Sequence, residues 1–590
     1  MKRRDRNNQL KLANVADRVM KIKRQQSRYE RSINAIWELF SDYSEISTIH
    51  GVRYLGEKKR HWSERVWWFL SIFLSIGLSA KFISQASSKW INSPVIVSFS
   101  EESTPVHRIP FPAVTICTDI KLKQTNINYT EIWHQLSGDY YLQSNITDDT
   151  VKLVHLLSPL CERPPIHIED FILKKNLTFD SHEMDEIFFK NLRANAPTLK
   201  DLFFKCTWHR RNVSCSDIFK EIITDEGLCF TFNYLNASEI YSQSIPAERL
   251  LVPVHNKSSQ NWKLINRNQP ITGIKETDIY PYRVLSGSEG LRIDLRIFEK
   301  DIDYLCGGQV QSFKILLHSA GEVPQMKKYY YRIPLDHDIV MAVRPNIMNS
   351  TESLIKDYSP NQRKCIAENE KDLHSFIKYT QRNCQLNELT FRTAYRCGCV
   401  TFGMPRSART RICRTRSDME CVQIVEDERI RNVLEKKALD FNCLPGCESI
   451  SYDAEVSMAR LHRSEYQRAA KQSKEGRRRR HARIFISFKD EQFFASRRSE
   501  IYDITNFIAE CGGILGLFMG ISILSVIEIL YFSTLRLGCS ILKRKRIKKR
   551  RQQQLKELNE LVTNGSAESG DEPKQFENNN GTNLLPELKY

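Results

Sequence analysis

The sequence predicts a membrane protein in which two transmembrane α-helices flank a large, disulfide-rich α+β domain outside the cell. Three observations predict this fold class: two separate apolar segments, basic clusters on the same side of both, and an even number of cysteines between them. At 590 residues the chain is long enough for a large core or several domains.

The apolar segment near the C-terminus, IAECGGILGLFMGISILSVIEILYF, carries the strongest functional signal. It is long enough for a helix to cross a bilayer, which takes about 20 residues. Gly512, Gly516 and Gly520 recur every fourth residue and form a stripe along which another backbone can approach closely. Glu510 and Glu528 place carboxylates at its two ends, where a charge is costly unless it faces water, a partner or an ion. This pattern favours a helix that lines a pore over a simple anchor.

The other apolar segment runs roughly from Val66 to Ile83 and is interrupted by Lys81, which can snorkel to an interface. A signal anchor is the alternative interpretation, but the segment lies too far from the N-terminus for a removable signal peptide. Basic residues precede this segment and follow the C-terminal one, so the positive-inside rule places both termini in the cytoplasm. The basic residues are Lys58, Lys59, Arg60 and Arg65 before the first segment, and Arg536, Lys543 to Arg546 and Lys548 to Arg551 after the second.

These signals divide the chain into five parts. The predicted boundaries are a cytoplasmic N-terminal region (1–65), transmembrane helix 1 (66–86), an extracellular domain (87–505), transmembrane helix 2 with the pore (506–533) and a cytoplasmic tail (534–590). Short helices are expected in the two cytoplasmic parts, over Ile33–Phe40 and Gln552–Leu561.

Cysteine usage and glycosylation sequons support the exterior location of the central part. Fourteen of the 16 cysteines lie between Cys117 and Cys447, which suits an oxidising compartment, whereas Cys511 and Cys539 stand apart. The cysteine-rich helical region, 365–447, has the cysteine density of a disulfide scaffold, and zinc fits poorly because one residue separates two of its cysteines. Sequons begin at Asn128, Asn145, Asn176, Asn212, Asn236, Asn256 and Asn349.

The net charge of +18 does not by itself indicate a nucleic-acid partner. Much of the excess lies in the two juxtamembrane clusters, which are predicted to meet anionic lipid headgroups. The run Arg477–Arg480 lies in the predicted exterior, where a solvated loop is favoured over a dibasic protease site.

Alternating or β-branched runs predict strands in the exterior at Phe111–Cys117, Gly227–Asn233, Phe313–His318 and Ala482–Phe488. The segment Asp357–Leu389 is expected to be partly helical, with Leu373, Phe376 and Ile377 on one face. No nucleophile elbow, HExxH or phosphate loop is present, so the sequence predicts neither an enzyme nor a cofactor or metal site.

Seven motifs, in order, carry a resemblance to the degenerin/epithelial sodium channel family and its insect pickpocket branch. They span most of residues 40–540. The motifs are His50-Gly51, FPAVTIC from Phe111, GLCFTFN from Gly227, FKILLHSAGEVP from Phe313, CGCVTFGMPR from Cys397, NCLPGC from Asn442, and ECGGILGLFMGISILSVIEILYF from Glu510.

The resemblance implies a set of disulfide bonds. The implied pairs are Cys117–Cys229, Cys206–Cys215, Cys365–Cys447, Cys384–Cys443, Cys397–Cys421 and Cys399–Cys413, with Cys161–Cys306 left as a pair by elimination. A further bridge of the family pattern is missing, because Glu388 and Phe441 stand where its two cysteines would be.

The resemblance also implies a plasma-membrane channel in which three related subunits, identical or different, surround a sodium-selective pore. Gly520, Ile521 and Ser522 match the selectivity tract of the family. The alternative interpretation is that Gly520 only continues the glycine stripe of Gly512 and Gly516. Gly516 matches the position of amiloride block, Ala509 and His50-Gly51 match gating positions, and Na⁺ is the permeant ion rather than a bound cofactor. Glu528 is expected either to concentrate cations or to pair with a basic group of a neighbouring segment.

Two other functions remain open at this point. One is a non-conducting regulatory subunit or surface receptor that assembles with conducting relatives. The other is an ectoenzyme, for which no catalytic constellation is found. The intact Gly520-Ile521-Ser522 tract favours the conducting subunit, since a silent subunit has no need of a filter.

Overall fold

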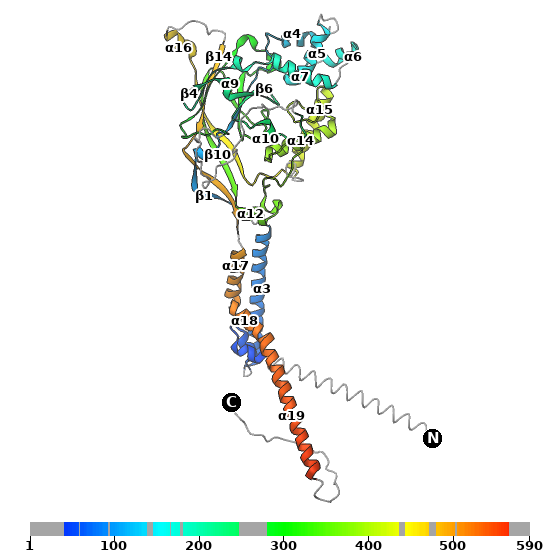
Figure 1. Cartoon of the computed structure of the whole chain (residues 1–590), viewed down its shortest axis with the longest axis vertical. Coiled ribbons are helices and arrows are strands. Elements are labelled where there is room, and N and C mark those ends of the chain that lie inside the picture. The colour runs from blue at the N-terminus through cyan, green and yellow to red at the C-terminus, as the bar shows by residue number, and fades with distance from the viewer. Residues whose placement is uncertain are drawn as a thin grey trace, which may run out of the picture. The chain divides into compact units, whose positions relative to one another are not determined.

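The computed structural model describes residues 40–57, 60–92, 95–138, 146–165, 167–177, 181–246, 280–435, 443–470, 479–501 and 504–565. The chain forms two compact units (Figure 1). The first unit comprises residues 1–92 and 502–590, and the second comprises residues 93–501. The expected helix at Ile33–Phe40 lies almost entirely outside the described residues.

The first unit is built from helices. Its N-terminal part contains a helix at 40–46, α2 (Val52–Gly56) and α3 (Trp62–Asn92). Its C-terminal part contains α17 (Ile504–Met519), α18 (Ile523–Tyr531), a π-helical turn (Phe532–Arg536) and α19 (Leu537–Gly565). The helix expected at Gln552–Leu561 is therefore the end of a longer helix.

Two helices in this unit are long and apolar enough to cross a membrane. They are Trp62–Asn92 and Ile523–Gln554, with a mean hydropathy of 1.7 and 1.4, and α17 is a shorter apolar helix. α3 extends beyond the predicted span at both ends, because polar residues on each side continue the helix past the apolar stretch. The predicted second span is not one helix, because it is interrupted between α17 and α18.

The second unit contains an eight-stranded sheet and a five-stranded sheet. The larger sheet has the order β1 (Val95–Pro105), β15 (Gln492–Glu500), β10 (His337–Ser350), β14 (Arg479–Phe488), β7 (Gly290–Phe298), β3 (Phe203–Trp208) and β4 (Arg211–Val213), and β13 (Ser449–Arg460) pairs with β10. The smaller sheet has the order β5 (Phe219–Thr224), β6 (Gly227–Phe232), β2 (Ala113–Thr118), β8 (Ser312–His318) and β9 (Tyr331–Pro334). A third, two-stranded sheet pairs β11 (Cys399–Val400) with β12 (Arg411–Ile412).

The four strands expected from the sequence are present. β2, β6 and β8 are buried along their whole length, so their sequences do not alternate between apolar and exposed polar residues, although β8 also buries Ser312, Lys314 and His318. β10 alternates instead, with Ile339, Met341 and Val343 buried on one face, as a strand with one core-facing side requires. β14 does not lead directly into the first unit, because β15 follows it in the sequence.

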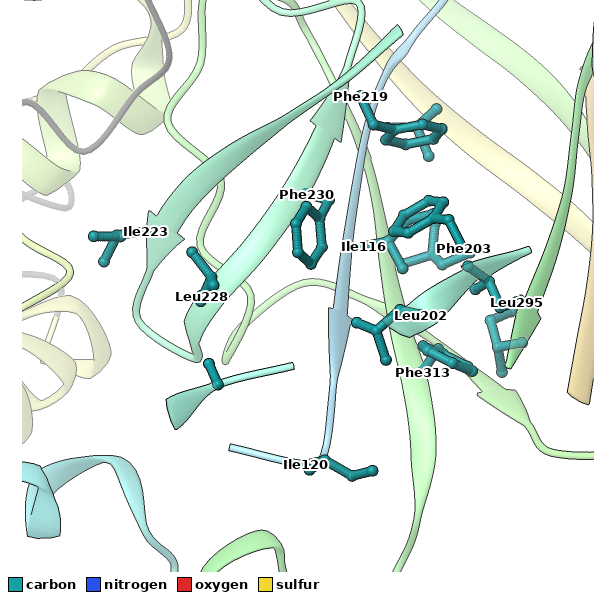
Figure 2. Close-up of a cluster of buried hydrophobic side chains, with 14 of the residues drawn as sticks. Ile116, Ile120, Leu202, Phe203, Phe219, Ile223, Leu228, Phe230, Leu295 and Phe313 are labelled. Carbon is teal, nitrogen blue, oxygen red and sulfur yellow. The ribbon is translucent and has the colours of Figure 1, made fainter. Parts of the chain in front are cut away.

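The hydrophobic core of the second unit includes side chains from both large sheets. The ring of Phe111 packs edge-on against Trp208 and Phe488 of the eight-stranded sheet, and against Phe232 of the five-stranded sheet. Figure 2 shows another part of this core, where Phe203, Phe219 and neighbouring side chains converge from several strands. Aromatic pairs of this kind add about 0.5–1.5 kcal/mol each to the stabilisation from burial.

Helices flank these sheets in the second unit. They are α4 (Tyr129–Ser137), α5 (Asp148–Leu157), α6 (Ile168–Lys174), α7 (Ser181–Asn195), α8 (Leu199–Leu202), α9 (Cys215–Ile218), α10 (Ala237–Ile240), α11 (Tyr304–Gly307), α12 (Glu352–Asp357), α13 (Pro360–Arg363), α14 (Gln381–Cys397), α15 (Arg416–Leu434) and α16 (Arg463–Ala469).

The expectation of a helical face formed by Leu373, Phe376 and Ile377 is wrong. These residues lie in an irregular segment before α14, where Leu373 and Phe376 are buried and Ile377 is exposed. Phe376 makes a β-bridge with Tyr241 and packs against its ring. Apolar residues at spacings of three and four resemble a helix stripe, but here tertiary contacts fix an irregular backbone.

Seven disulfide bonds link residues of the second unit, and they join the same pairs that the resemblance and elimination indicated. They are Cys117–Cys229, Cys161–Cys306, Cys206–Cys215, Cys365–Cys447, Cys384–Cys443, Cys397–Cys421 and Cys399–Cys413. The two free cysteines, Cys511 and Cys539, belong to the first unit.

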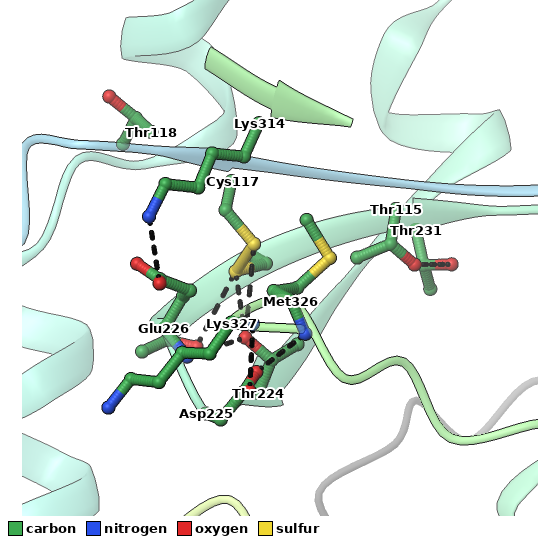
Figure 3. The surroundings of a disulfide bond; sticks show 12 residues. Thr115, Cys117, Thr118, Thr224, Asp225, Glu226, Thr231, Lys314, Met326 and Lys327 are labelled. Atoms are coloured by element: carbon green, nitrogen blue, oxygen red, sulfur yellow. Dashed lines mark hydrogen bonds and ion pairs between the residues drawn. A yellow bond between two sulfur atoms is a disulfide. The ribbon is translucent and has the colours of Figure 1, made fainter. Parts of the chain in front are cut away.

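A buried group of charges lies beside the Cys117–Cys229 disulfide (Figure 3). Glu226 pairs with both Lys121 and Lys314, the latter at 2.8 Å. Burial alone would raise the pKa of Glu226, but the two ammonium groups outweigh this effect and lower it. Paired charges of this kind tolerate burial, whereas removing one partner would leave an uncompensated charge.

The four-arginine run is divided by the start of β14. Arg477 and Arg478 lie outside the described residues, whereas Arg479 and Arg480 belong to the strand and pair with β7. Arg480 also pairs with the carboxylate of Asp336. Half of the run is therefore part of a sheet rather than a loop.

Candidate functional site

The site begins with a break in the apolar C-terminal helix. α17 ends at Met519, α18 begins at Ile523, and the three residues between them are not helical. Gly520 has a φ of +67°, a left-handed conformation that costs roughly 1–2 kcal/mol for a residue with a side chain. Gly520 therefore does not simply continue the glycine stripe along one helix.

The end of the break is stabilised by its own side chains. Ser522 is the N-cap of α18, and its hydroxyl accepts a hydrogen bond from the Ser525 amide at 3.3 Å. The Ser522 amide in turn donates to the Ser525 hydroxyl at 3.1 Å. This reciprocal capping satisfies donors that the start of a helix otherwise leaves without partners.

The His50-Gly51 segment packs directly against this break. The His50 amide donates to the Met519 carbonyl at 3.0 Å, and a Cβ atom at Gly520 would lie 2.6 Å from His50 Nδ1. Gly51 has a φ of +88°, and a Cβ atom there would lie 3.1 Å from Ile72 of α3. Glycine is required at both positions by backbone conformation and by close contact.

Glu528 is held by the same N-terminal segment. Its carboxylate accepts hydrogen bonds from the Thr48 amide at 3.3 Å and from the Thr48 hydroxyl at 3.0 Å. The Thr48 and Ser525 hydroxyl oxygens are 2.7 Å apart, and Ser525 is fully buried. Because Thr48 gives its one hydroxyl proton to Glu528, Ser525 is the donor in this contact.

This arrangement bears on the two expectations for Glu528. In the part of the chain that the structure describes, no basic side chain forms an ion pair with it. The carboxylate is instead held by neutral donors, which leaves its negative charge uncompensated. Such a charge attracts cations more strongly than a carboxylate neutralised by lysine or arginine.

Residues before and after His50-Gly51 in the sequence hold this N-terminal segment in place through further contacts. Asp42 pairs with Arg536 at 3.4 Å, and the ring of Tyr43 packs edge-on against Phe532. After His50-Gly51, the ring of Tyr54 stacks on the ring of Trp68 of α3, with ring centroids 4.4 Å apart. The N-terminal segment thus touches both apolar helices of its unit.

α3 and α17 pack against each other through aromatic side chains. Trp90 stacks on Phe507, and Phe82 stacks on Phe518, with centroid distances of 4.8 and 5.8 Å. The small residues of α17 are not covered by these contacts. Ala509, Gly512 and Gly513 are exposed, and a Cβ atom at Gly512 or Gly513 would meet no atom within 4 Å.

The structure brings together some of the residues predicted from the sequence and leaves others apart. His50 and Gly51 meet the tract formed by Gly520, Ile521 and Ser522. Glu528 lies beside them through Thr48, Gly516 precedes the break by one turn, and Ala509 and Glu510 are two turns further away. Sequence reasoning missed Thr48, Ser525 and Asp42, and it used Arg536 only as part of the basic flank, since no local pattern links residues almost 500 positions apart.

The sequon asparagines differ in exposure. Asn128, Asn176 and Asn212 are exposed, whereas Asn236 and Asn349 are half-buried. Asn236 is also the N-cap of α10. Asn145 and Asn256 lie outside the described residues.

Chemically, the site offers backbone and hydroxyl oxygens at an interrupted helix, with an uncompensated carboxylate two turns beyond. Groups of His, Cys, Asp and Glu able to hold a metal ion are absent from the described residues. Irregular backbone at membrane depth is tolerated where it is buried in protein, as on the His50 side of the break, or where it lines a water-filled path. The geometry therefore fits the passage of a cation better than chemistry on a substrate.

Comparison with known proteins agrees with this geometry. The chain is 27% identical over 528 residues to Pickpocket protein 28 of Drosophila melanogaster, with 87% of this chain and 81% of that protein covered. It is 23% identical to Sodium channel protein Nach of the same organism, covering 84% and 86% of the two chains. It is 22% identical to Acid-sensing ion channel 4-B of Danio rerio, covering 83% and 75%.

A family-level match covers most of the chain. The family model described as amiloride-sensitive sodium channel matches residues 43–532, which include the N-terminal segment, the whole second unit and the helix break. Relatives across this family are ion channels rather than enzymes, and their subunits assemble with related subunits in the plasma membrane. The chain therefore belongs to the amiloride-sensitive sodium channel family, also called the degenerin/epithelial sodium channel family, and is an ion channel subunit.

Proposed function

We propose that this chain is a subunit of a sodium-selective, amiloride-sensitive cation channel that passes Na⁺ down its gradient through a pore formed by three subunits. The observation that carries the proposal is the interruption at Gly520-Ile521-Ser522, packed against His50. A simple anchor gains nothing from a break in its helix, which leaves backbone groups without intrahelical partners.

Sodium selectivity would arise where the backbone leaves the helical path. Carbonyl groups at the end of α17 and the exposed Ser522 hydroxyl can replace part of the hydration shell of an ion. Gly516, one turn before the break, is the proposed position of amiloride block. Glu528 would raise the local cation concentration on the cytoplasmic side of the filter.

The small-residue face of α17 supports assembly with further subunits. Ala509 is exposed, and a Cβ atom at Gly512 or Gly513 would meet no atom of the described residues within 4 Å. Small residues allow another helix to approach closely, and such contacts drive association inside membranes. Ala509 would then lie at a packed gate between subunits.

The proposed topology places residues 1–65 and 534–590 in the cytoplasm, with the chain crossing the plasma membrane twice. Residues 87–505 would face the exterior, with sugars at the exposed Asn128, Asn176 and Asn212. The basic cluster of α19 would meet anionic lipid headgroups.

Voltage clamp of cells that express the Ala509→Val variant tests this function. A bulkier side chain at the packed gate is expected to hold the pore open. The expected result is a steady inward current that falls when sodium is replaced by potassium and is blocked by amiloride. Ile508→Val, a conservative change at the neighbouring residue, serves as the matched control and should give no steady current.

The contrary result is also informative. Surface-labelled protein without current would reject a self-sufficient channel. Co-expression with a conducting relative would then separate an obligate partner subunit from a non-conducting regulatory subunit or receptor.

A further inference from the structure

One face of the eight-stranded sheet, on the side away from the core, carries arginine and phenylalanine side chains in a row. Strand β7 buries Leu295 and Ile297 in the core. Arg296 and Phe298 alternate with them and therefore lie on the opposite, outer face. Phe298 lies opposite Arg479 of β14 in the register of the two strands. Paired residues of neighbouring strands share a face, so these three side chains belong to one surface.

An irregularity in β3 brings a further ring to the same face. The register between β3 and β7 shifts between Phe203 and Lys205. The residue between them, Phe204, is 49% exposed, as expected where a bulge redirects a side chain. Arg463 of α16 lies beside the Phe204 ring, which connects this short helix to the sheet.

Each of the two rings has two arginines beside it. The guanidinium carbons of Arg463 and Arg296 lie 5.2 and 5.5 Å from the centroid of the Phe204 ring. Those of Arg296 and Arg479 lie 5.5 and 5.1 Å from the centroid of the Phe298 ring. These five residues, from α16, β3, β7 and β14, are called the arginine ladder below.

Hydrogen bonds orient two of the ladder arginines before any ligand binds. Arg463 donates from Nη1 to His481 Nδ1 at 3.1 Å. Burial, followed by the charge of Arg463, lowers the pKa of His481 to about 4, so this histidine is neutral and can accept the hydrogen bond. Arg296 donates to the carbonyls of Lys200 at 2.9 Å and Asp201 at 3.2 Å. A guanidinium group that is already oriented loses less freedom when it binds an anion.

The carboxylates near the ladder do not neutralise it. Within the described residues, the three ladder arginines form no ion pair, and the nearby acidic residues pair with arginines outside the ladder. The pairs are Asp294 with Arg483, Asp336 and Glu299 with Arg480, and Glu465 with Arg468. Burial lowers the pKa of Arg463, and three neighbouring arginines lower it further, although the carboxylate of Asp294 opposes them. Positive charges gathered in this way repel one another, and a bound anion would relieve the repulsion.

The ladder suits a row of anionic groups better than a single ion. Its three guanidinium groups come from α16, β7 and β14, so the positive charge extends across the face. Guanidinium groups bind the paired oxygens of sulfate, phosphate and carboxylate groups. Outside a cell, where the second unit is proposed to lie, chains of sulfated sugars carry such groups in a row, and basic surfaces bind polymers of the heparin type.

We propose that the arginine ladder binds a sulfated polysaccharide, whose sulfate groups contact Arg463, Arg296 and Arg479. The proposal goes beyond ion conduction. It rests on the proposed exterior location of the second unit but not on a conducting pore, because the ladder belongs to the second unit alone.

Binding of a fluorescent, fully sulfated heparin hexasaccharide to intact cells tests the proposal. The cells display the full-length chain and make no sulfated polysaccharide of their own, and a surface label measures how much of the chain each culture displays. Intact cells are needed because the juxtamembrane basic clusters, proposed to lie in the cytoplasm, would also bind a polyanion. Saturable binding is expected, and the desulfated hexasaccharide, which keeps its carboxylates, should bind roughly tenfold more weakly.

Two arginines of the ladder are suited to substitution. Arg463→Gln and Arg479→Gln should each weaken binding roughly threefold, and together roughly tenfold or more, because each removes one guanidinium group. Arg296 is left unaltered, since it also holds two backbone carbonyls. Arg409→Gln is the matched control, because Arg409 is an exposed arginine of the β11–β12 loop outside the ladder, and it should bind as the unaltered chain does. Each single variant is compared at equal surface label, so a folding failure of the double variant leaves the test intact.

Several outcomes would overturn the proposal. They are the absence of saturable binding to surface-labelled cells, unchanged binding by both single variants, and equal binding of the desulfated hexasaccharide. Displacement by an equal concentration of inorganic sulfate would assign the ladder to a single small anion instead. Tighter binding of polyglutamate would assign it to an acidic polypeptide. None of these results bears on the proposed conduction of sodium, which is measured as a current.

Discussion

The two units of this chain are stabilised in different ways. The second unit has a large apolar core, divided into three clusters, and seven disulfide bonds, so its own residues supply nearly all that its fold needs. The first unit leaves most of its large apolar side chains exposed, for example Leu517 at 83%, and relies on a few polar contacts, a few aromatic pairs and two glycines. The comparison teaches that the second unit is stabilised from within, while the first leaves apolar side chains that its own described residues do not cover.

The largest effect is expected from a disulfide of the second unit. Replacing both cysteines of Cys117–Cys229, which are 112 residues apart, should cost about 5 kcal/mol in the chain-entropy model. Replacing the Cys206–Cys215 pair, only 9 residues apart, should cost about half of that. The midpoint of thermal unfolding of the purified chain measures both, and equal losses would show that loop length does not govern this unit.

The next largest effect concerns the first unit alone. Gly520→Ala should abolish current, because alanine is strained at a φ of +67° and its Cβ would overlap His50. Unfolding of the second unit should not change. Gly538→Ala is the control, since a Cβ atom there meets nothing within 4 Å. Normal current from Gly520→Ala would show that the break is not required in this conformation.

A smaller effect is expected where Thr48 holds Glu528. Thr48→Ala should change the sodium-to-potassium permeability ratio by about tenfold or more, since a hydrogen bond to a charged group contributes roughly 1.5–3 kcal/mol. Thr48→Ser keeps the hydroxyl and should restore the ratio. In a Glu528→Gln background, Thr48→Ala should add little. Equal effects in both backgrounds would mean that Thr48 acts through another group.

The smallest effect is the response of the second unit to acid. Burial lowers the pKa of His318 from 6.5 to about 3, so it stays neutral in the folded chain. Below pH 6.5 the unfolded chain takes up this proton and the folded chain does not. Stability present above pH 6.5 is therefore lost as the pH falls, by about 1.4 kcal/mol per pH unit and so by about 2 kcal/mol at pH 5.

Thermal unfolding between pH 7.5 and 5 measures this loss. His318→Gln should show a shallower decline, whereas His374→Gln, at an exposed side chain, should behave as the unaltered chain. An unchanged slope for His318→Gln would place the acid response on other groups.

The sequence predicted the parts of each unit that depend on local pattern. The strands at Phe111–Cys117 and Gly227–Asn233 were predictable because buried β-branched runs bounded by turn residues have few other uses. The motifs identified His50 and Gly520 separately. Their contact was not predictable, because it depends on a left-handed glycine and on chain segments that are distant in sequence.

The misplaced helix shows the same limit. Leu373 and Phe376 have helical spacing, but a β-bridge to Tyr241 fixes another backbone.

The hydrogen bond between the His50 amide and the Met519 carbonyl joins main chain to main chain. Sequence drift at either position therefore leaves it intact, because every residue except proline supplies that amide. A truncated product lacking its first 50 residues would lose the bond altogether, however faithfully the remainder folded. Insertions, deletions and alternative start sites near this segment should consequently be far more damaging than most single replacements.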